Sequence, residues 1–340
     1  MRIAVLSPVW FPVPPRGYGG IEWIVSLLAD GLVDAGHEVT LFAAGDSRTN
    51  AELAWIYEVA PSDQIGIAEV EIRHALSCFV RAGEFDVIND HSGPPAAVIA
   101  GAVATPCVHT VHGPLVGEPG DVYEQVAQVA PRTRLVSISM KQRQPRPRLP
   151  WLANIPNALD FSLYPVHPHR GDYLLFLGRM NREKGAHRAV AVATEAGLPL
   201  KLAGKMREPA EQEYFRQFIA PHLRDGEIEY LGEVTHGEKV ELLQNARATL
   251  FPIDWEEPFG LVMIESMACG TPVIATRRGA VPEVIEHGRS GIIVDDYRAM
   301  AAALEDADRF EPLELRRLAQ ERFSQERMVA DYVAAFEEVV

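Results

Sequence analysis

The feature that most constrains the fold of this chain is a regular alternation of short apolar runs with segments of helical periodicity. Residues 2–6 form an apolar run, residues 21–32 place apolar side chains at helical spacing, and residues 39–44 form the next apolar run. Strand–helix–strand units of this kind pack as parallel sheets covered by helices. The alternation resumes at residues 173–177 and continues to residues 291–294. The sequence therefore predicts an α/β protein built on parallel sheets.

The length of the chain indicates two domains. Its 340 residues exceed what one core of ordinary size organises. A polar, proline-containing stretch at residues 164–171 separates the two runs of alternation. We therefore expect a first domain at residues 1–163 and a second at residues 164–324.

Composition excludes several classes of protein. The formal charge of −15 argues against nucleic acid or an anionic membrane as the main partner. The longest apolar runs are far too short for a membrane span, so we expect no stable membrane insertion. Cys78, Cys107 and Cys269 show no paired spacing, which predicts neither a disulfide framework nor a zinc site. With no secretory signal pattern near Met1, these features favour a cytoplasmic protein.

Residues 141–148 are a local exception, with four basic side chains among glutamines and prolines. Two interpretations remain open. A solvated loop is the favoured one. Contact with an anionic acceptor or a lipid is the alternative.

The stretch from Trp255 to Gly270 carries the clearest chemical pattern. An apolar run at residues 248–252 leads into a loop containing Glu257, and a short helix follows, with Glu265 inside it. Backbone amides at the start of such a helix are free donors that bind anions. Carboxylates on both sides would repel a phosphate but accept hydrogen bonds from hydroxyl groups. A nucleotide sugar, with hydroxylated rings on both sides of a diphosphate, fits this pattern; a capping Glu257 and a solvated Glu265 are the structural alternative.

Arg179 and Lys184 flank a turn after the apolar run at residues 173–177. Two cations at the end of a buried strand suit a diphosphate, because they would neutralise the charge that builds on a leaving group. A solvated pair of charges is the alternative.

These motifs resemble the signature of the retaining family 4 glycosyltransferases of GT-B fold. Glu257 and Glu265 stand eight residues apart with Pro-Phe-Gly-Leu between them and Ala-Cys-Gly-Thr-Pro-Val-Ile-Ala after them, and Gly-Arg is followed by Glu-Lys-Gly at residues 178–185. The resemblance implies two Rossmann-like domains that face a central cleft, with the last helix, about residues 325–340, crossing back to the first domain.

The resemblance also implies roles for particular residues. Glu257 would hold hydroxyls of the transferred sugar, and Glu265 the ribose hydroxyls. Further donor-binding candidates are Arg179, Lys184, Phe259, Gly260, Leu261 and Val262, with Glu233 and Val234 as weaker candidates for contact with the base.

In the first domain, the resemblance assigns Gly19 and Gly20 to a glycine loop near the diphosphate and the acceptor, although a plain entry turn is an alternative. His112 resembles the family histidine that contacts the transferred sugar, whereas His109 inside the strand is expected in the core. Asp90 and His91, at the end of a strand, are weak candidates for acceptor binding. Ala158 departs from the family's Pro-Asn-Gly turn, and an alanine in a left-handed conformation there would cost about 1 kcal/mol or more.

The resemblance predicts a hexosyltransferase that retains the configuration of the sugar by front-side displacement. UDP-glucose is the first candidate donor and GDP-mannose the second; the acceptor could be a small molecule, a lipid or a natural-product scaffold. Because cationic side chains and amides can replace a metal and no Asp-x-Asp stands in the second domain, we expect no required metal or other cofactor.

Three alternatives remain open: a GT-B sugar phosphorylase or synthase, a non-catalytic nucleotide-sugar binder, and a NAD-dependent oxidoreductase. The last is disfavoured because the loop after the first strand lacks the GxGxxG fingerprint.

Overall fold

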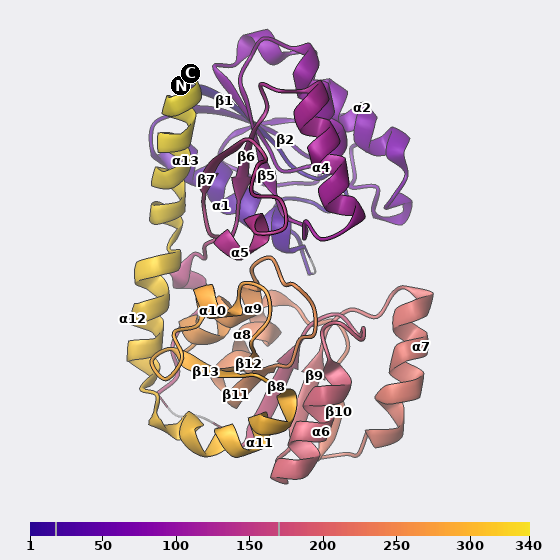
Figure 1. Cartoon of the computed structure of the whole chain (residues 1–340), viewed down its shortest axis with the longest axis vertical. Helices are drawn as coiled ribbons and strands as arrows, with labels where there is room; N and C mark the ends of the chain where they lie inside the picture. Colours follow the sequence, from indigo (N-terminus) through magenta and orange to yellow (C-terminus); the bar gives the residue numbers. More distant parts are fainter. Residues whose placement is uncertain (18, 169–170) are drawn as a thin grey trace. The chain divides into compact units, whose positions relative to one another are not determined.

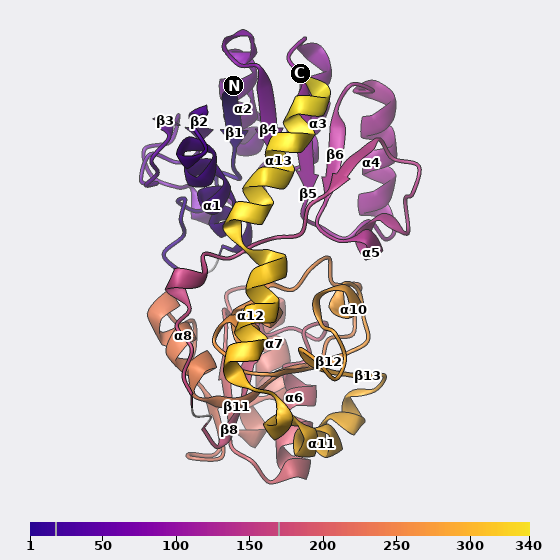
Figure 2. The same ribbon diagram turned by 90° about the vertical axis from the view of Figure 1, so that its left-hand side faces the viewer.

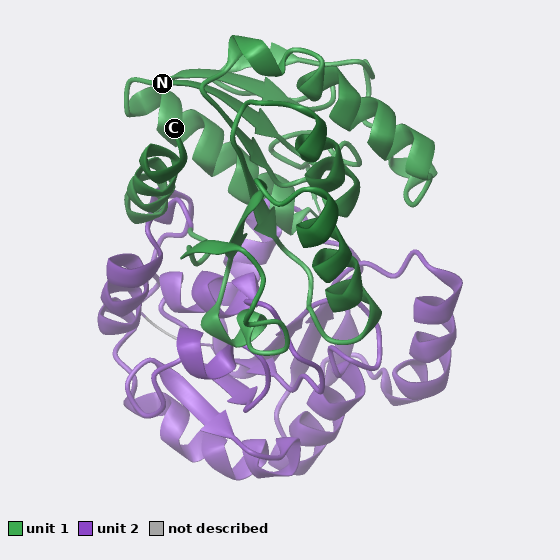
Figure 3. Cartoon of the chain, turned by 45° about the horizontal axis from the view of Figure 1, so that its top comes forward, with its two compact units in different colours: residues 1–158, 325–340 green, residues 159–324 purple. Residues whose placement is uncertain are grey.

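A computed structural model of the protein describes residues 1–17, 19–168 and 171–340. The chain divides into two compact units (Figures 1 and 3). Unit 1 contains residues 1–158 and 325–340, and unit 2 contains residues 159–324. The sequence placed the boundary at residues 163 and 164, a few residues later. Within the expected linker, residues 169 and 170 lie outside the described residues.

Unit 1 is built on a seven-stranded sheet in the order β3-β2-β1-β4-β5-β6-β7, in which every pair of neighbours is parallel. Its central strands are apolar and buried, as strands covered on both faces require. The strands are β1 (Arg2–Leu6), β2 (Glu38–Phe42), β3 (Glu52–Ala54), β4 (Val87–Asp90), β5 (Cys107–Val111), β6 (Arg134–Ser137) and β7 (Trp151–Asn154).

Helices lie on both sides of this sheet, with α1 and α13 on one side and α2 and α4 on the other (Figure 1). On the second side, side chains of α2 and α3 pack with β1, β2 and β4 into one buried apolar cluster. The helices of the unit are α1 (Gly20–Asp34), α2 (Ala68–Phe79), α3 (Pro94–Ile99), α4 (Glu118–Val129), α5 (Met140–Arg143) and α13 (Gln325–Val339).

Helix α13 follows unit 2 in the sequence but belongs to unit 1. It lies along α1 (Figure 2). The approach is close because Gly31 of α1 has no side chain: a Cβ there would lie 2.5 Å from Cγ2 of Val329. Tyr332 and Phe336 are buried, and the Oη atom of Tyr332 lies 2.9 Å from Oγ1 of Thr110 on β5. The last helix is therefore part of the core of the first unit.

Unit 2 repeats the architecture with a six-stranded parallel sheet in the order β10-β9-β8-β11-β12-β13. The five residues of β8 are all buried, and α6 packs its apolar face into the same core. The strands are β8 (Tyr173–Leu177), β9 (Leu200–Ala203), β10 (Ile228–Tyr230), β11 (Ala246–Phe251), β12 (Val273–Thr276) and β13 (Gly291–Val294). The helices are α6 (Ala186–Ala196), α7 (Pro209–Phe218), α8 (His236–Gln244), α9 (Leu261–Ala268), α10 (Val281–Val284), α11 (Met300–Ala303) and α12 (Pro312–Phe323).

The structure corrects three details of the sequence analysis. The helical periodicity of residues 298–309 predicts a single helix, but in the structure they form α11 between two 3-10 helices, η6 (Tyr297–Ala299) and η7 (Leu304–Arg309). Strands β3 and β7, at the two edges of the first sheet, were not expected. Among the described residues only glycines have a positive φ, so Ala158 carries no left-handed strain.

Candidate functional site

The segment that carries the two glutamates forms a strand, a loop and a helix, as the sequence predicted. Strand β11 ends at Phe251, and α9 begins at Leu261 after Gly260, which caps it in the left-handed conformation (φ 87°). Glycine adopts this conformation without the strain that a Cβ would cause. The amides of Leu261 and Val262 open the helix and have no carbonyl one turn earlier within it. This helix end therefore presents backbone donors to an anion.

Glu257 is buried and held by two donors. Its Oε2 atom lies 2.5 Å from Nζ of Lys184 and accepts a hydrogen bond of 3.1 Å from Nε1 of Trp255. The same ammonium group lies 4.6 Å from the centre of the Trp255 ring. Only 7% of Glu257 is exposed, so pairing is what makes the burial of its charge tolerable. The structure thus joins Lys184 to Glu257, which the sequence named separately.

Gly279 fixes the backbone of the same loop from behind. The amide of Ala280 donates to the carbonyl of Glu257 at 2.8 Å. A Cβ on Gly279, whose φ is 50°, would lie 2.3 Å from both N and O of Glu257. No side chain fits at this position without displacing the Glu257 loop.

Glu265 lies in α9, more than one turn inside the helix, and is equally buried. Its Oε1 atom accepts a hydrogen bond of 3.0 Å from Tyr164 and a second from Nζ of Lys239 on α8. Burial and the nearby Glu265 carboxylate raise the pKa of Tyr164, so the phenol stays protonated as the donor. Each of the two glutamates is thus paired with a lysine.

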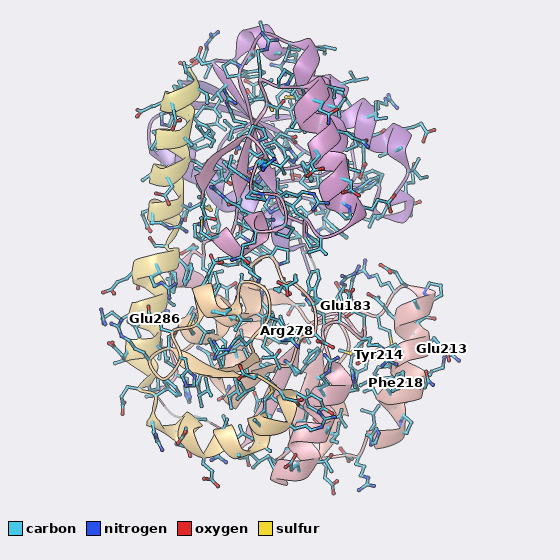
Figure 4. The ribbon with its side chains drawn as sticks, in the orientation of Figure 1. Glu183, Glu213, Tyr214, Phe218, Arg278 and Glu286 are labelled. Carbon is cyan, nitrogen blue, oxygen red and sulfur yellow. The ribbon has the colours of Figure 1, made fainter. Side chains whose placement is uncertain are left out.

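Arg179 does not join the Lys184–Glu257 pair. Its Nη1 atom lies 4.0 Å from Oε1 of Glu211 on α7, a buried carboxylate whose Oε2 caps the start of that helix. Both residues line a pocket of about 480 Å³, which Tyr214 and Phe218 of α7 also border (Figure 4). Arg179 therefore faces open space next to α7.

The remaining donor-site candidates differ in what they can contact. The Phe259 side chain is buried edge-on against Phe323, with 5.7 Å between ring centres, so only its backbone is available. The Glu233 carboxylate accepts a hydrogen bond of 2.7 Å from Arg207. Val234 is half-buried.

In unit 1 the glycine pair begins α1. Gly19 is the N-cap with φ 151°, and a Cβ there would lie 2.7 Å from Cβ of Pro15. The conformation and the close approach both require glycine. Glu22 in the first turn is buried, which raises its pKa to about 7. No pattern in the sequence singles out this carboxyl group.

Asp90 and His91 are buried and serve the interior of unit 1. Asp90 accepts hydrogen bonds from Ser92 and lies 2.5 Å from Nδ1 of His109, whose Nε2 lies 2.8 Å from the Tyr123 hydroxyl. His91 is 2% exposed and has hydrogen-bond partners at both ring nitrogens. These partners give both buried side chains a structural role inside unit 1, and contact with an acceptor stays a prediction.

His112 is half-buried and lies beside His91, with 2.9 Å between Nε2 of His112 and Nδ1 of His91. Burial and repulsion from His109 lower the pKa of His112 to about 3, so its ring is neutral. His109 is 1% exposed, which confirms its expected place in the core.

The basic stretch at residues 141–148 is partly neutralised. Arg146 pairs with Asp121 and Glu124 of α4. Arg143 stacks on the Trp151 ring at 5.0 Å and donates to Ser137 at 2.6 Å. These contacts give two of its four cations a structural role.

Residues 1–17, 19–168 and 171–340 contain neither a cluster of metal-binding side chains nor a membrane-spanning helix. No group of three or more His, Cys, Asp or Glu side chains there could hold a metal ion. None of the helices in those residues has the length and apolar character to cross a membrane.

Several residues of these clusters carried no sequence signal of their own. Trp255 adjoins the signature, Tyr164, Lys239 and Gly279 lie outside it, and Asn89 lies inside a strand. Only the fold brings them to the glutamates and histidines they contact.

Two parallel α/β units, the second bearing a glutamate-flanked helix start, define the class of GT-B glycosyltransferases. The structure of HepE from Anabaena, in complex with UDP and glucose, has the same fold: TM-score 0.75 at 19% identity, covering 99% of this chain and 100% of that one. The family model described as glycosyl transferases group 1 matches residues 165–324, and the model described as glycosyltransferase family 4 matches residues 18–160. The chain belongs to the family 4 glycosyltransferases and is a sugar-transferring enzyme.

Characterised relatives align over most of the chain. Glycogen synthase of Mycobacterium tuberculosis is 26% identical over 359 aligned positions, covering 89% of this chain and 85% of the relative. Phosphatidyl-myo-inositol mannosyltransferase of Mycolicibacterium smegmatis is 28% identical over 336 positions, covering 89% and 84%. The two relatives differ in the sugar and the acceptor that their names state.

Proposed function

We propose that this protein transfers a hexose from a nucleotide sugar to a hydroxyl acceptor with retention of configuration, and that UDP-glucose is the first candidate donor. The observation that carries the proposal is the start of α9, where free backbone amides lie between two buried glutamates that are each paired with a lysine. The amides and Lys184 suit a diphosphate. Glu257 suits sugar hydroxyls, and Glu265 suits ribose hydroxyls.

In the proposed reaction the bond between the anomeric carbon and the diphosphate oxygen breaks. The acceptor oxygen forms its bond to the same face of the sugar, and the acceptor proton passes to the departing phosphate oxygen. Arg179, Lys184 and the amides of Leu261 and Val262 stabilise the charge on the leaving diphosphate. His112 is our candidate for contact with the transferred sugar, and Glu233 with Val234 for contact with the base. The cations take the part that a metal plays elsewhere, so we propose that no metal is required.

GDP-mannose is the second candidate donor, because one relative is named a mannosyltransferase while another is named a glycogen synthase. The complex of HepE with UDP and glucose supports the uridine nucleotide. The acceptor is proposed only as a hydroxyl compound: a small molecule, a lipid or a natural product.

Calorimetric titration with UDP, GDP and ADP, each with and without magnesium after treatment with a chelator, tests the proposal. We expect one diphosphate to bind equally well in both conditions and the corresponding nucleotide sugar to be consumed when an acceptor is supplied. If none of the three binds, the assignment of the α9 site is wrong. If binding requires magnesium, the metal-independent mechanism is wrong.

A further inference from the structure

Three hydrogen bonds in unit 1 run from a backbone carbonyl to the ring of His112. Nδ2 of Asn89 donates to the carbonyl oxygen of Val108 at 3.1 Å, and Oδ1 of Asn89 lies 2.8 Å from Nε2 of His91. Nδ1 of His91 in turn lies 2.9 Å from Nε2 of His112. Asn89 is fully buried on β4, so its amide group cannot form hydrogen bonds with solvent instead.

This chain of contacts determines where each proton lies. A backbone carbonyl can only accept, so the amide nitrogen of Asn89 must face Val108 and its oxygen must face His91. Nε2 of His91 therefore carries a hydrogen. In a neutral ring its Nδ1 is then an acceptor, and the hydrogen between the two rings belongs to Nε2 of His112. Nδ1 of a neutral His112 is left as a lone pair.

The direction of these hydrogen bonds depends on His91 being neutral. An imidazolium at His91 would donate from both ring nitrogens and reverse the hydrogen bond between His91 and His112. Burial, with repulsion from His112 and His109, holds the pKa of His91 well below its usual range. The carboxylate that precedes it in the sequence, Asp90, directs its oxygens to His109 and Ser92. The groups that face His91 are Asn89 of β4, His109 of β5, His112 after β5, and Tyr332 of α13.

We propose that Asn89 and His91 are positioning residues that lock His112 in the Nε2–H tautomer, so that its Nδ1 lone pair accepts a hydrogen bond from a hydroxyl of the transferred sugar. Among the described residues Nδ1 of His112 has no hydrogen-bond partner, and the ring is half-buried where that of His91 is fully buried. The part concerning the sugar rests on the proposed function.

The lock also gives a rule of selectivity. A lone pair accepts only from a donor, so a sugar in which the contacted hydroxyl is replaced by hydrogen or by a methyl ether loses this bond. A site that holds a buried acceptor for a hydroxyl rejects the analogue that lacks it. Nucleotide sugars with single deoxy positions would locate the hydroxyl concerned.

The first test reads the tautomers directly in the ligand-free protein. Long-range ¹⁵N–¹H correlation spectra of ¹⁵N-histidine-labelled protein distinguish protonated from unprotonated ring nitrogens, and the spectrum of His112→Ala assigns the signal among the 11 histidines. We expect a protonated Nε2 and an unprotonated Nδ1 for His112 at neutral pH. The opposite pattern overturns the proposal, whether or not the protein transfers sugar.

The second test replaces Asn89, whose side-chain amide determines the tautomers of His91 and His112. In Asn89→Asp the carboxylate cannot donate to Val108, and its charge favours an imidazolium at His91. We expect the proton of His112 to move to Nδ1, kcat/KM for the nucleotide sugar to fall roughly tenfold, and the affinity for the free nucleoside diphosphate to remain unchanged.

Thr110→Val is the matched control, because it removes another buried hydrogen bond of the same unit, that to Tyr332. It leaves the hydrogen bonds from Asn89 through His91 to His112 intact. Its His112 signal should match the wild type. Equal transfer rates in Asn89→Asp and Thr110→Val would overturn the positioning role. The tautomer measured in the wild-type protein tests the proposed protonation state of His112 even if Asn89→Asp does not fold. Diphosphate binding in unit 2 tests the proposed function separately from both.

Discussion

Nζ of Lys184 lies 2.5 Å from Oε2 of Glu257, a residue 73 positions further along the chain. The cation we assign to the diphosphate is therefore held by the carboxylate we assign to the sugar. A bound diphosphate must share or take over this ammonium group. The two residues should consequently respond to mutation in opposite directions when diphosphate binding alone is measured.

We predict that Lys184→Ala weakens nucleoside diphosphate binding about tenfold or more, since a hydrogen bond to a charged group contributes roughly 1.5–3 kcal/mol. Glu257→Gln should bind the diphosphate at least as tightly as wild type, because the competing carboxylate is gone, yet lose sugar transfer. Calorimetry and a product assay measure the two effects. Equal losses of affinity in both variants would contradict this division of roles.

The pairing of Glu265 with Lys239 and Tyr164 leads to a second prediction. If Glu265 binds the ribose hydroxyls, Glu265→Ala should lose about tenfold in affinity for the nucleoside diphosphate but little for its 2′,3′-dideoxy analogue. Tyr164→Phe, which keeps the carboxylate and removes one donor, is the control and should retain the preference for ribose. A preference for ribose that survives in Glu265→Ala would place the hydroxyls elsewhere.

Much of the fold could be read from the sequence because buried parallel strands are continuous apolar runs. Strands β1, β8 and β13 lie where those runs predicted them. The edge strands β3 and β7 were missed because each is partly exposed and pairs on one side only, so neither needs such a run.

The candidate site could also be predicted only in part. The glutamates were visible because they sit within a contiguous motif. Their partners were not: Lys184 and Tyr164 lie 73 and 101 positions from the glutamates they contact. The burial of Asp90 and His91 was also hidden, because a polar strand end reads the same whether its side chains face a ligand or one another.

A third prediction concerns the backbone behind Glu257. Gly279→Ala should lower the free energy of unfolding by about 3 kcal/mol and abolish transfer, because the new methyl group displaces the Glu257 loop. Gly288→Ala is the matched control, since Gly288 also has a positive φ (78°) but has open space where its Cβ would lie. Its free energy of unfolding should fall only by the cost of the left-handed strain, about 1–2 kcal/mol, and its activity should be unchanged. Chemical denaturation and the product assay compare them.

Glu22 gives a prediction of pH dependence. Burial raises its pKa from the ordinary 4.5 to about 7 in the folded protein. The folded state therefore binds this proton more tightly than the unfolded state, and the stability it contributes is complete below pH 4.5 and is lost as the pH rises through 7. Glu22→Gln, which cannot ionise, should gain stability relative to wild type between pH 5 and 8, by about 3 kcal/mol at the upper end.

Thermal unfolding of both proteins across that range measures the difference. A constant difference between wild type and Glu22→Gln would show that Glu22 titrates normally.

The assignment of α13 to unit 1 has a consequence for synthesis on the ribosome. The chain leaves unit 1 after Ala158 and returns at Gln325, and Leu159 pairs with Ser324 where the two crossings meet. Unit 2 is continuous and can fold as soon as it emerges, whereas unit 1 waits for Tyr332 and Phe336 to fill its core. Until then the face of α1 against which α13 packs is uncovered. The first half of the protein to be made is thus the last to be finished.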